Sequence, residues 1–214
     1  MKQFELVIFD WDGTLMDSIS KIVHCMQALA QELEIAIPSE KVVRDVIGLS
    51  MPEAMRALFP AETEATRQSW INRYKVHYQV LNATPSPLFD GVHELLDGLA
   101  QKQKKLAIAT GKGRPGLDAI LSQTGLGPKF HASRCADETR SKPHPQMLHE
   151  LLAELGVCPS RAVMIGDSAF DLKMAHNAGI AAIGVDYGTH DRDTLLAVSP
   201  LTVVSHPLEL LQHL

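Results

Sequence analysis

Two aspartates separated by a single residue end the first apolar run of the chain. The stretch VIFDWDGTLMDS carries Asp10 and Asp12 directly after the apolar residues 6–9, and a glycine follows them. One carboxylate of such a pair can attack as a nucleophile, and a neighbouring carboxylic acid can give or take a proton. Carboxylate oxygens are also the ligands that Mg²⁺ prefers. The pair therefore indicates chemistry rather than packing at this position.

Other polar side chains follow later apolar runs. Thr110 follows LAIA, Asp167 and Asp171 follow AVMI, and Lys142 stands in SKPHP. The carboxyl ends of parallel strands meet at one edge of a sheet, so residues far apart in sequence can share one pocket there. Clustered carboxylates favour a hard cation, while a hydroxyl and an ammonium group neutralise charge on phosphoryl oxygens. This mixture is typical of Mg²⁺-dependent phosphoryl transfer.

The elements that must position these residues are predicted from hydrophobic patterning. Short apolar runs without polar alternation suit strands buried on both faces of a parallel sheet, and they occur at 6–9, 106–109, 162–165, 181–185 and 202–204. Helical spacing lies between them, as in 92–99 behind Asp90 as a cap and in 148–155 before Gly156. This alternation predicts an α/β fold with a doubly wound, Rossmann-like parallel sheet.

One long interval after the first strand lacks any strand pattern. We expect residues 17–84 to form an inserted all-helical cap domain, and residues 1–16 and 85–214 to form the catalytic core. Trp70, Tyr74 and Tyr78 recur at helical spacing, which favours packing within the cap. Gly48 and Ser50 lie in a turn, VIGLSMPEA, that is either a specificity loop over the strand ends or an ordinary helix connection.

Composition limits the classes of partner. The 214 residues are 45% hydrophobic with a formal net charge of −5, so a buried core is expected and nucleic acid is not. Three scattered cysteines predict neither a disulfide framework nor a zinc site. Because no apolar run is long enough to span a bilayer and no signal peptide is recognisable, we expect a cytoplasmic protein that does not bind membranes. We also expect a monomer or weak dimer.

Four ordered motifs together give the chain a family resemblance. DWDGT, AIATGK, SKPHP and IGDSAFDL, which span nearly the whole sequence, resemble those of haloacid dehalogenase superfamily phosphatases with a helical cap. The chain is most similar to the phosphoglycolate phosphatase-like and β-phosphoglucomutase-like members. The resemblance implies hydrolysis of a small phosphorylated metabolite through an aspartyl-phosphate, with Mg²⁺ as the cofactor.

The resemblance also implies a role for each motif residue. Asp10 would be the nucleophile, Asp12 the general acid and base, and Thr110 and Lys142 would hold the transferring phosphoryl group. The implied metal ligands are Asp10, the backbone carbonyl of Asp12, Asp167 and Asp171, the last directly or through another ligand. The implied donors of backbone amides to the phosphate are Trp11, Asp12 and Gly111.

Alternatives remain at this point. A phosphosugar mutase of the same fold is one, although related mutases carry a cap histidine twelve positions after the nucleophile, where this chain has Ile22 and places His24 nearby. A receiver-like phosphoacceptor or binding module is another. Asp167 could instead cap the helix after it. Phosphoglycolate phosphatases usually show Thr-Asn-Lys where this chain has Thr110, Gly111 and Lys112, which leaves the substrate open.

Overall fold

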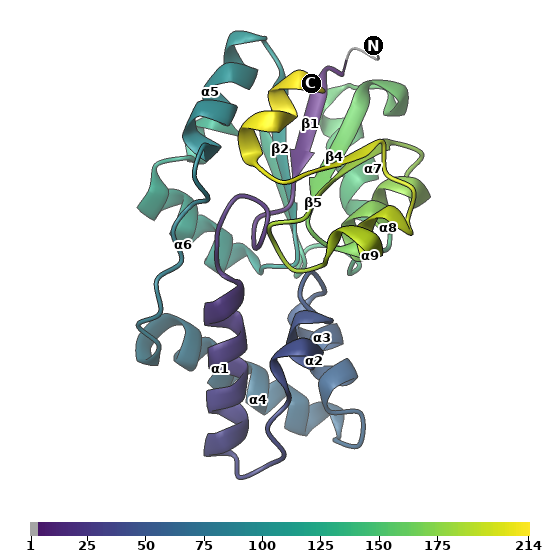
Figure 1. Ribbon diagram of the computed structural model, residues 1–214. Coiled ribbons are helices and arrows are strands. Elements are labelled where there is room, and N and C mark those ends of the chain that lie inside the picture. The colour runs from purple at the N-terminus through teal and green to yellow at the C-terminus, as the bar shows by residue number, and fades with distance from the viewer. Residues whose placement is uncertain (1–3) are drawn as a thin grey trace.

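The computed structural model describes residues 4–214 and has a sheet lobe above a helical lobe (Figure 1). Six parallel strands form one sheet in the order β3-β2-β1-β4-β5-β6. Their bounds are β1 Leu6–Phe9, β2 Lys105–Thr110, β3 Ala132–Cys135, β4 Ala162–Gly166, β5 Ala181–Val185 and β6 Thr202–Val204. This strand order and the flanking helices confirm the predicted doubly wound fold.

The strand β3 is an element that the sequence patterning missed. It lies at an edge of the sheet beside β2, and three of its four residues are only partly buried. Ser133 and Arg134 occupy its middle, so it lacks the continuous apolar run of the central strands. The five predicted strands are all present, and β1, β2 and β4 are buried almost throughout.

Helices cover both faces of the sheet. Their bounds are α5 Val92–Gln101, α6 Arg114–Thr124, α7 Gln146–Leu155, α8 Ala169–Asn177 and α9 Arg192–Leu196, with shorter turns η2 Gly127–Lys129, η3 Pro159–Arg161 and η4 Pro207–Gln212. Val7 and Phe9 pack on the face that carries α5 and α6. Leu6 and Ile8 point to the opposite face, which carries α7 and α8. The period of two along β1 thus buries both of its faces.

The predicted end of α7 is confirmed, whereas the predicted cap of α5 is wrong. Gly156, with φ 64°, ends α7 in the left-handed conformation that glycine favours. Asp90, however, does not cap α5, because the residue before this helix is Gly91 at φ 83° and no side chain bonds to the helix start. The left-handed turn at Gly91 carries Asp90 into solvent, so the capping prediction was wrong.

The helical lobe lies beyond the carboxyl ends of the strands (Figure 1). It contains α1 Ile19–Glu32, α2 Glu40–Arg44, α3 Met51–Leu58, α4 Glu64–Val76 and the π-helix η1 His77–Leu81. Trp70 and Tyr74 are buried in its own apolar cluster and Tyr78 packs against that cluster, which confirms their predicted packing. Among the described residues, no helix is both long and apolar enough to cross a membrane.

Candidate active site

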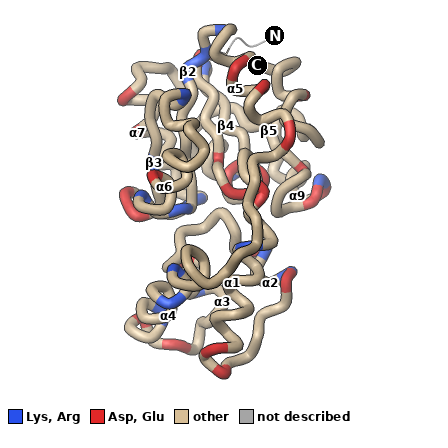
Figure 2. The backbone as a smooth tube through the Cα atoms, turned by 90° about the vertical axis from the view of Figure 1, so that its left-hand side faces the viewer, with Lys and Arg blue, Asp and Glu red and all other residues tan. Residues whose placement is uncertain are grey.

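The polar residues of the sequence motifs gather where three central strands end. Asp10 directly follows β1, Thr110 is the last residue of β2, and Asp167 directly follows β4. The strand β1 pairs in parallel with β2 on one side and with β4 on the other, so these three positions are neighbours at one edge. Figure 2 shows acidic segments of the sheet lobe at this edge, facing the helical lobe.

Three buried carboxylates form the centre of the site. Asp10, Asp167 and Asp171 each offer an oxygen within 4.8 Å of the other two. Burial raises the pKa of Asp10 well above its usual range; the nearby Lys142 ammonium opposes that rise and the other two carboxylates add to it. The Oδ1 atom of Asp10 is buried and accepts no well-aligned hydrogen bond within residues 4–214. Its remaining interaction there is an ion pair with Lys142 at 2.8 Å.

Lys142 joins two of these carboxylates from a loop that lies between β3 and α7. Its Nζ lies 2.8 Å from Asp10 Oδ1 and 2.6 Å from Asp171 Oδ1, and its side chain is fully buried. Desolvation disfavours its ammonium form, but the two carboxylates outweigh that effect and raise the pKa of Lys142. The family resemblance also implies that Lys142 restrains the Asp10 carboxylate, whereas its second partner, Asp171, was not predicted.

Asp171 has a structural task besides any role at a metal ion. Its Oδ2 accepts hydrogen bonds from the Ser168 amide and hydroxyl, and Ser168 caps α8 through the Asp171 amide in a capping box. Ser168 and not Asp167 is therefore the cap, which corrects the capping alternative for Asp167. A Cβ atom on Gly166 would lie 2.3 Å from the Asp171 Cβ, so only glycine fits there.

Asp167 is held by donors from two loops. The Thr14 hydroxyl donates to its Oδ1 at 3.0 Å, and the Thr189 amide donates to its Oδ2 at 2.8 Å. Burial, with a contribution from Asp171, nevertheless raises the pKa of Asp167 to about 6. These two hydrogen bonds fix the carboxylate in place without neutralising it.

The donor set fits a hard divalent cation. When Asp10, Asp12, Asp167 and Asp171 are ionised, the cations that pair with them within residues 4–214 are the ammonium groups of Lys142 and Lys112. A magnesium-like ion would balance the surplus negative charge, and it prefers oxygen ligands such as these carboxylates, including Asp10 Oδ1, which accepts no well-aligned hydrogen bond within residues 4–214. The Asp12 carboxylate is not part of the cluster of three, which leaves its backbone carbonyl as the ligand that the resemblance implies.

Asp12 lies apart from the three clustered carboxylates, and not all of its contacts were predicted from the sequence. Its Oδ1 accepts a hydrogen bond from the Ser18 hydroxyl at 2.7 Å, and its Oδ2 lies 3.0 Å from Lys112 Nζ. The Lys112 ammonium lies 5.0 Å from the ring centroid of Tyr78, a residue of η1. Ser18 and Lys112 were missed as site residues, although the TGK phrase after a strand end was a usable signal for Lys112.

The remaining motif residues build the loops around these carboxylates. The Trp11 ring is fully buried in the sheet lobe's core, and its indole N–H donates to the Met16 sulfur at 3.4 Å. Gly13 adopts φ 81°, and a Cβ there would lie 2.1 Å from Asp167 Oδ2. Thr110 accepts a hydrogen bond from the Lys112 amide at 3.1 Å, and within residues 4–214 no hydrogen bond joins it to Asp10.

The turn between α2 and α3 of the helical lobe contacts these loops directly. A Cβ on Gly111 would lie 2.7 Å from the carbonyl oxygens of Gly48 and Leu49, and a Cβ on Gly48 would lie 2.9 Å from Ser168 Oγ. The Ser50 amide donates to the Ser141 hydroxyl at 2.8 Å. The predicted turn thus lies directly against the loops of the site.

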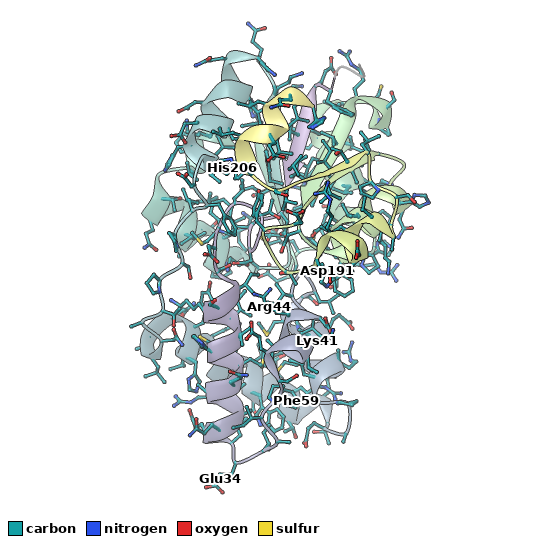
Figure 3. All side chains as sticks on the ribbon, in the orientation of Figure 1. Glu34, Lys41, Arg44, Phe59, Asp191 and His206 are labelled. Carbon is teal, nitrogen blue, oxygen red and sulfur yellow. The ribbon has the colours of Figure 1, made fainter. Side chains whose placement is uncertain are left out.

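A second contact between the lobes comes from α2. Arg44, labelled between the lobes in Figure 3, donates from Nη1 to the carbonyl oxygens of Gly188 at 3.3 Å and Thr189 at 3.4 Å. The Thr189 amide is also a donor to Asp167. The helical lobe therefore touches the loop that holds one of the three clustered carboxylates.

Comparison with known proteins agrees with this geometry. The family model described as haloacid dehalogenase-like hydrolase matches residues 7–185. The "Probable phosphatase IndB" of Dickeya dadantii is 36% identical over 204 residues, which cover 93% of this chain and 88% of that protein. An N-acetylmuramic acid 6-phosphate phosphatase of Pseudomonas aeruginosa is 31% identical over 220 residues, covering 99% of this chain and 96% of that protein.

The fold comparison extends over both lobes. The crystal structure of a hydrolase from Pseudomonas syringae superposes with a TM-score of 0.88 at 24% identity, covering 99% of this chain and 97% of that one. The matched residues 7–185 include all three clustered carboxylates, Lys142 and the helical lobe. On the strength of these matches, the chain belongs to the haloacid dehalogenase-like hydrolases.

Proposed function

We propose that this hydrolase is a Mg²⁺-dependent phosphatase that cleaves a small phosphorylated metabolite through an aspartyl-phosphate on Asp10. The observation that carries the proposal is the buried Asp10 carboxylate, whose Oδ1 lies 2.8 Å from Lys142 Nζ and accepts no well-aligned hydrogen bond within residues 4–214. A nucleophilic carboxylate needs a lone pair that no hydrogen bond holds, and a phosphate needs the neighbouring ammonium group.

In the first step, Asp10 attacks the phosphorus atom and the bond from phosphorus to the leaving oxygen breaks. Asp12 in its acid form gives its proton to that oxygen, so an alcohol departs. Lys142 and the Thr110 hydroxyl hold the phosphoryl oxygens, together with the backbone amides near Trp11, Asp12 and Gly111. General acid catalysis of this kind is worth about 10²- to 10⁴-fold in rate.

In the second step, Asp12 as a carboxylate takes a proton from water while the water oxygen attacks phosphorus. The bond between phosphorus and the Asp10 oxygen then breaks, which releases inorganic phosphate and restores the Asp10 carboxylate and the acid form of Asp12. Ser18 and Lys112 support this assignment, because they hold the Asp12 side chain apart from the cluster of three carboxylates. The two aspartates thus act in different surroundings.

Mg²⁺ would be held by Asp10, the Asp12 carbonyl and Asp167, and Asp171 would either bind the ion directly or support the residues that do. The ion would supply positive charge for the phosphoryl oxygens. Asp171 already accepts hydrogen bonds from Lys142 and from the Ser168 amide and hydroxyl. These three donors favour a supporting role for Asp171 over direct ligation.

Residues 17–84 act as a cap that closes over the site, with 1–16 and 85–214 as the catalytic core. Closure excludes water during the first step and brings the Gly48–Ser50 turn into contact with the leaving group, so that the turn selects the substrate. Hydrolysis is favoured over mutase chemistry, because His24 is exposed and bonds to Thr84 at 3.3 Å while Ile22 packs in the helical lobe. A cytoplasmic location and a monomer or weak dimer are further parts of the proposal.

A panel of phosphate monoesters tests the proposal. It includes N-acetylmuramic acid 6-phosphate, the substrate in a relative's name, and phosphoglycolate. The wild type is expected to release phosphate from at least one ester with Mg²⁺ and from none after chelation. Asp10→Asn should lower kcat/KM by about 10⁴-fold or more. Asp17→Asn, which changes an exposed aspartate of the same loop, is the matched control. Equal turnover by wild type and Asp10→Asn would refute the mechanism.

A further inference from the structure

Lys112 belongs to the sheet lobe by its backbone and reaches the helical lobe with its side chain. Its amide donates to the Thr110 hydroxyl at 3.1 Å, and its carbonyl oxygen accepts from the Ala136 amide at 3.1 Å. These two bonds fix the backbone beside the end of β2. The side chain is only 13% exposed, and its ammonium group lies between Asp12 Oδ2, at 3.0 Å, and the ring centroid of Tyr78, at 5.0 Å. Lys112 therefore connects the two lobes.

Both carboxylate oxygens of Asp12 are held by neighbouring groups. The Ser18 hydroxyl donates to Oδ1 at 2.7 Å, and the Lys112 ammonium lies 3.0 Å from Oδ2. Ser18 directly precedes α1, yet its side chain makes no capping bond to that helix. Each carboxylate oxygen has a further lone pair, so these contacts leave Asp12 able to meet a leaving group. Because proton transfer depends on alignment, the groups that hold Asp12 set its efficiency.

Tyr78 is a fixed part of the helical lobe. It lies in η1, a π-helical turn that directly follows α4, and turns of this kind are frequent at functional sites. The adjacent His77 bonds through Nε2 to Glu32 of α1 at 2.7 Å. The ring centroid of Tyr78 lies 6.1 Å from that of Tyr74, which is buried in the lobe's apolar cluster. The Tyr78 ring therefore moves with the helical lobe.

An aromatic ring suits this position because its attraction for Lys112 does not depend on the charge of Asp12. In the proposed first step, Asp12 is in its acid form and offers the ammonium group no full negative charge. The electron-rich face of Tyr78 attracts a cation in either step. Lys112 thus keeps one partner throughout the reaction, provided that the helical lobe holds Tyr78 against it.

We infer that Lys112 is a positioning residue for Asp12 and that Tyr78 makes this positioning depend on closure of the helical lobe. The inference rests on the proposed function and goes beyond it, because it links the movement of one lobe to proton transfer in the other. Lys112 acts through Asp12 and not on the phosphoryl group. Its loss should therefore slow the reaction of those esters whose leaving group needs a proton.

Two classes of ester test the inference. Acetyl phosphate releases acetate, which departs as an anion, whereas an alkyl phosphate of the monoester panel releases an alcohol that needs a proton. Lys112→Met should lower kcat/KM about 10- to 100-fold for the alkyl phosphate but only about threefold or less for acetyl phosphate. Lys112→Arg should restore part of the loss. Tyr78→Leu should show the same dependence on the ester, and Tyr78→Phe, which keeps the ring, should lose less.

Lys21→Met is the matched control. The Lys21 ammonium lies 4.9 Å from the same Tyr78 ring, and within residues 4–214 the ion pair of Asp12 is with Lys112 and not with Lys21. This variant removes a cation from the ring without removing a partner of Asp12. It should keep the wild-type kcat/KM for both esters.

A double-mutant cycle decides the question if acetyl phosphate is not a substrate. In an Asp12→Asn background, Lys112→Met should change kcat/KM for the alkyl phosphate by about twofold or less, because no general acid remains to be positioned. Equal losses for both esters, or a Lys112→Met effect of full size in that background, would overturn the inference while the phosphatase proposal stands. Wild-type kinetics in Tyr78→Leu would overturn the link to closure. If the wild type hydrolysed no ester of the panel, the proposed function would fail and the inference with it.

Discussion

Lys142 is the residue on which the arrangement of the clustered carboxylates depends. Its buried ammonium contacts Asp10 and Asp171 at once, so it both orients the proposed nucleophile and fixes the start of α8. Asp167, by contrast, is oriented by a hydroxyl and an amide that carry no net charge. The carboxylates therefore differ in how strongly they hold a proton, and a metal ion must compete with those protons.

The protonation of Asp167 predicts a pH dependence of metal binding. Burial raises the pKa of Asp167 to about 6, so below pH 6 the metal-free protein carries a proton that Mg²⁺ must displace. The apparent Mg²⁺ affinity should therefore fall as pH drops through about 6, by about tenfold per unit from this proton alone. Titration calorimetry from pH 5 to 8 measures this, and an affinity that is flat across that range would contradict the assignment.

The raised pKa of Asp167 also predicts how the stability of the metal-free protein depends on pH. Because the folded state holds this proton more tightly than the unfolded chain, the stabilisation from Asp167 is complete below about pH 3.8 and is lost as pH rises through about 6. The loss is about 3 kcal/mol for a shift of this size. Urea unfolding with a chelator, compared between wild type and Asp167→Asn, measures it. Identical pH profiles for the two proteins would argue against the shift.

Gly13 offers a steric test of the same cluster. Alanine at position 13 would place its Cβ 2.1 Å from Asp167 Oδ2, in a backbone with φ 81°. Gly156→Ala is the matched control, since it has φ 64° and nothing within 4 Å. Both variants should lose about 1–2 kcal/mol of stability from the left-handed backbone. Only Gly13→Ala should also lose Mg²⁺ binding and most activity; equal phosphatase activity in the two variants would contradict the account.

At the scale of elements, sequence patterning predicted what depends on local chemistry. The five apolar strands, the α7 end at Gly156 and the aspartates at strand ends follow from patterns within a few residues. The edge strand β3 was missed because its polar residues are paired by β2, which lies about 25 residues earlier in the chain. The Asp171–Lys142 and Asp12–Lys112 pairs were missed for the same reason, since the partners meet only through the sheet.

The helix α2 links the helical lobe to the loop that positions Asp167. Arg44→Gln removes two hydrogen bonds to the carbonyl oxygens of Gly188 and Thr189. Each bond to a charged donor is worth about 1.5–3 kcal/mol at most, and partial exposure reduces this. We expect closure to weaken and kcat/KM to fall about 3- to 30-fold with little change in the melting temperature.

Lys41→Gln is the control for that variant, because Lys41 lies on the same helix (Figure 3) and pairs with Asp45 at the surface. In steady-state kinetics, Lys41→Gln should have the wild-type kcat/KM. Small-angle scattering should show a larger radius of gyration for Arg44→Gln than for Lys41→Gln. If both variants kept wild-type kinetics and dimensions, the contact would have no role in closure.

At the scale of the whole molecule, the two lobes have different roles. The sheet lobe fixes the buried carboxylates and Lys142 to strand ends inside a core that is packed on both faces. The helical lobe has an apolar cluster of its own and reaches the site through short contacts at Gly48, Ser50 and Arg44. Such a layout lets the lobe over the site move without disturbing the chemistry beneath it.

Trapping the phosphorylated enzyme tests the central claim most directly. Acid quenching during turnover, followed by borohydride reduction, converts an aspartyl-phosphate to homoserine at the labelled position, which peptide mass spectrometry identifies. The account predicts homoserine at position 10 in the wild type and none in Asp10→Asn. Turnover without any label at Asp10, or label at another carboxylate, would contradict it.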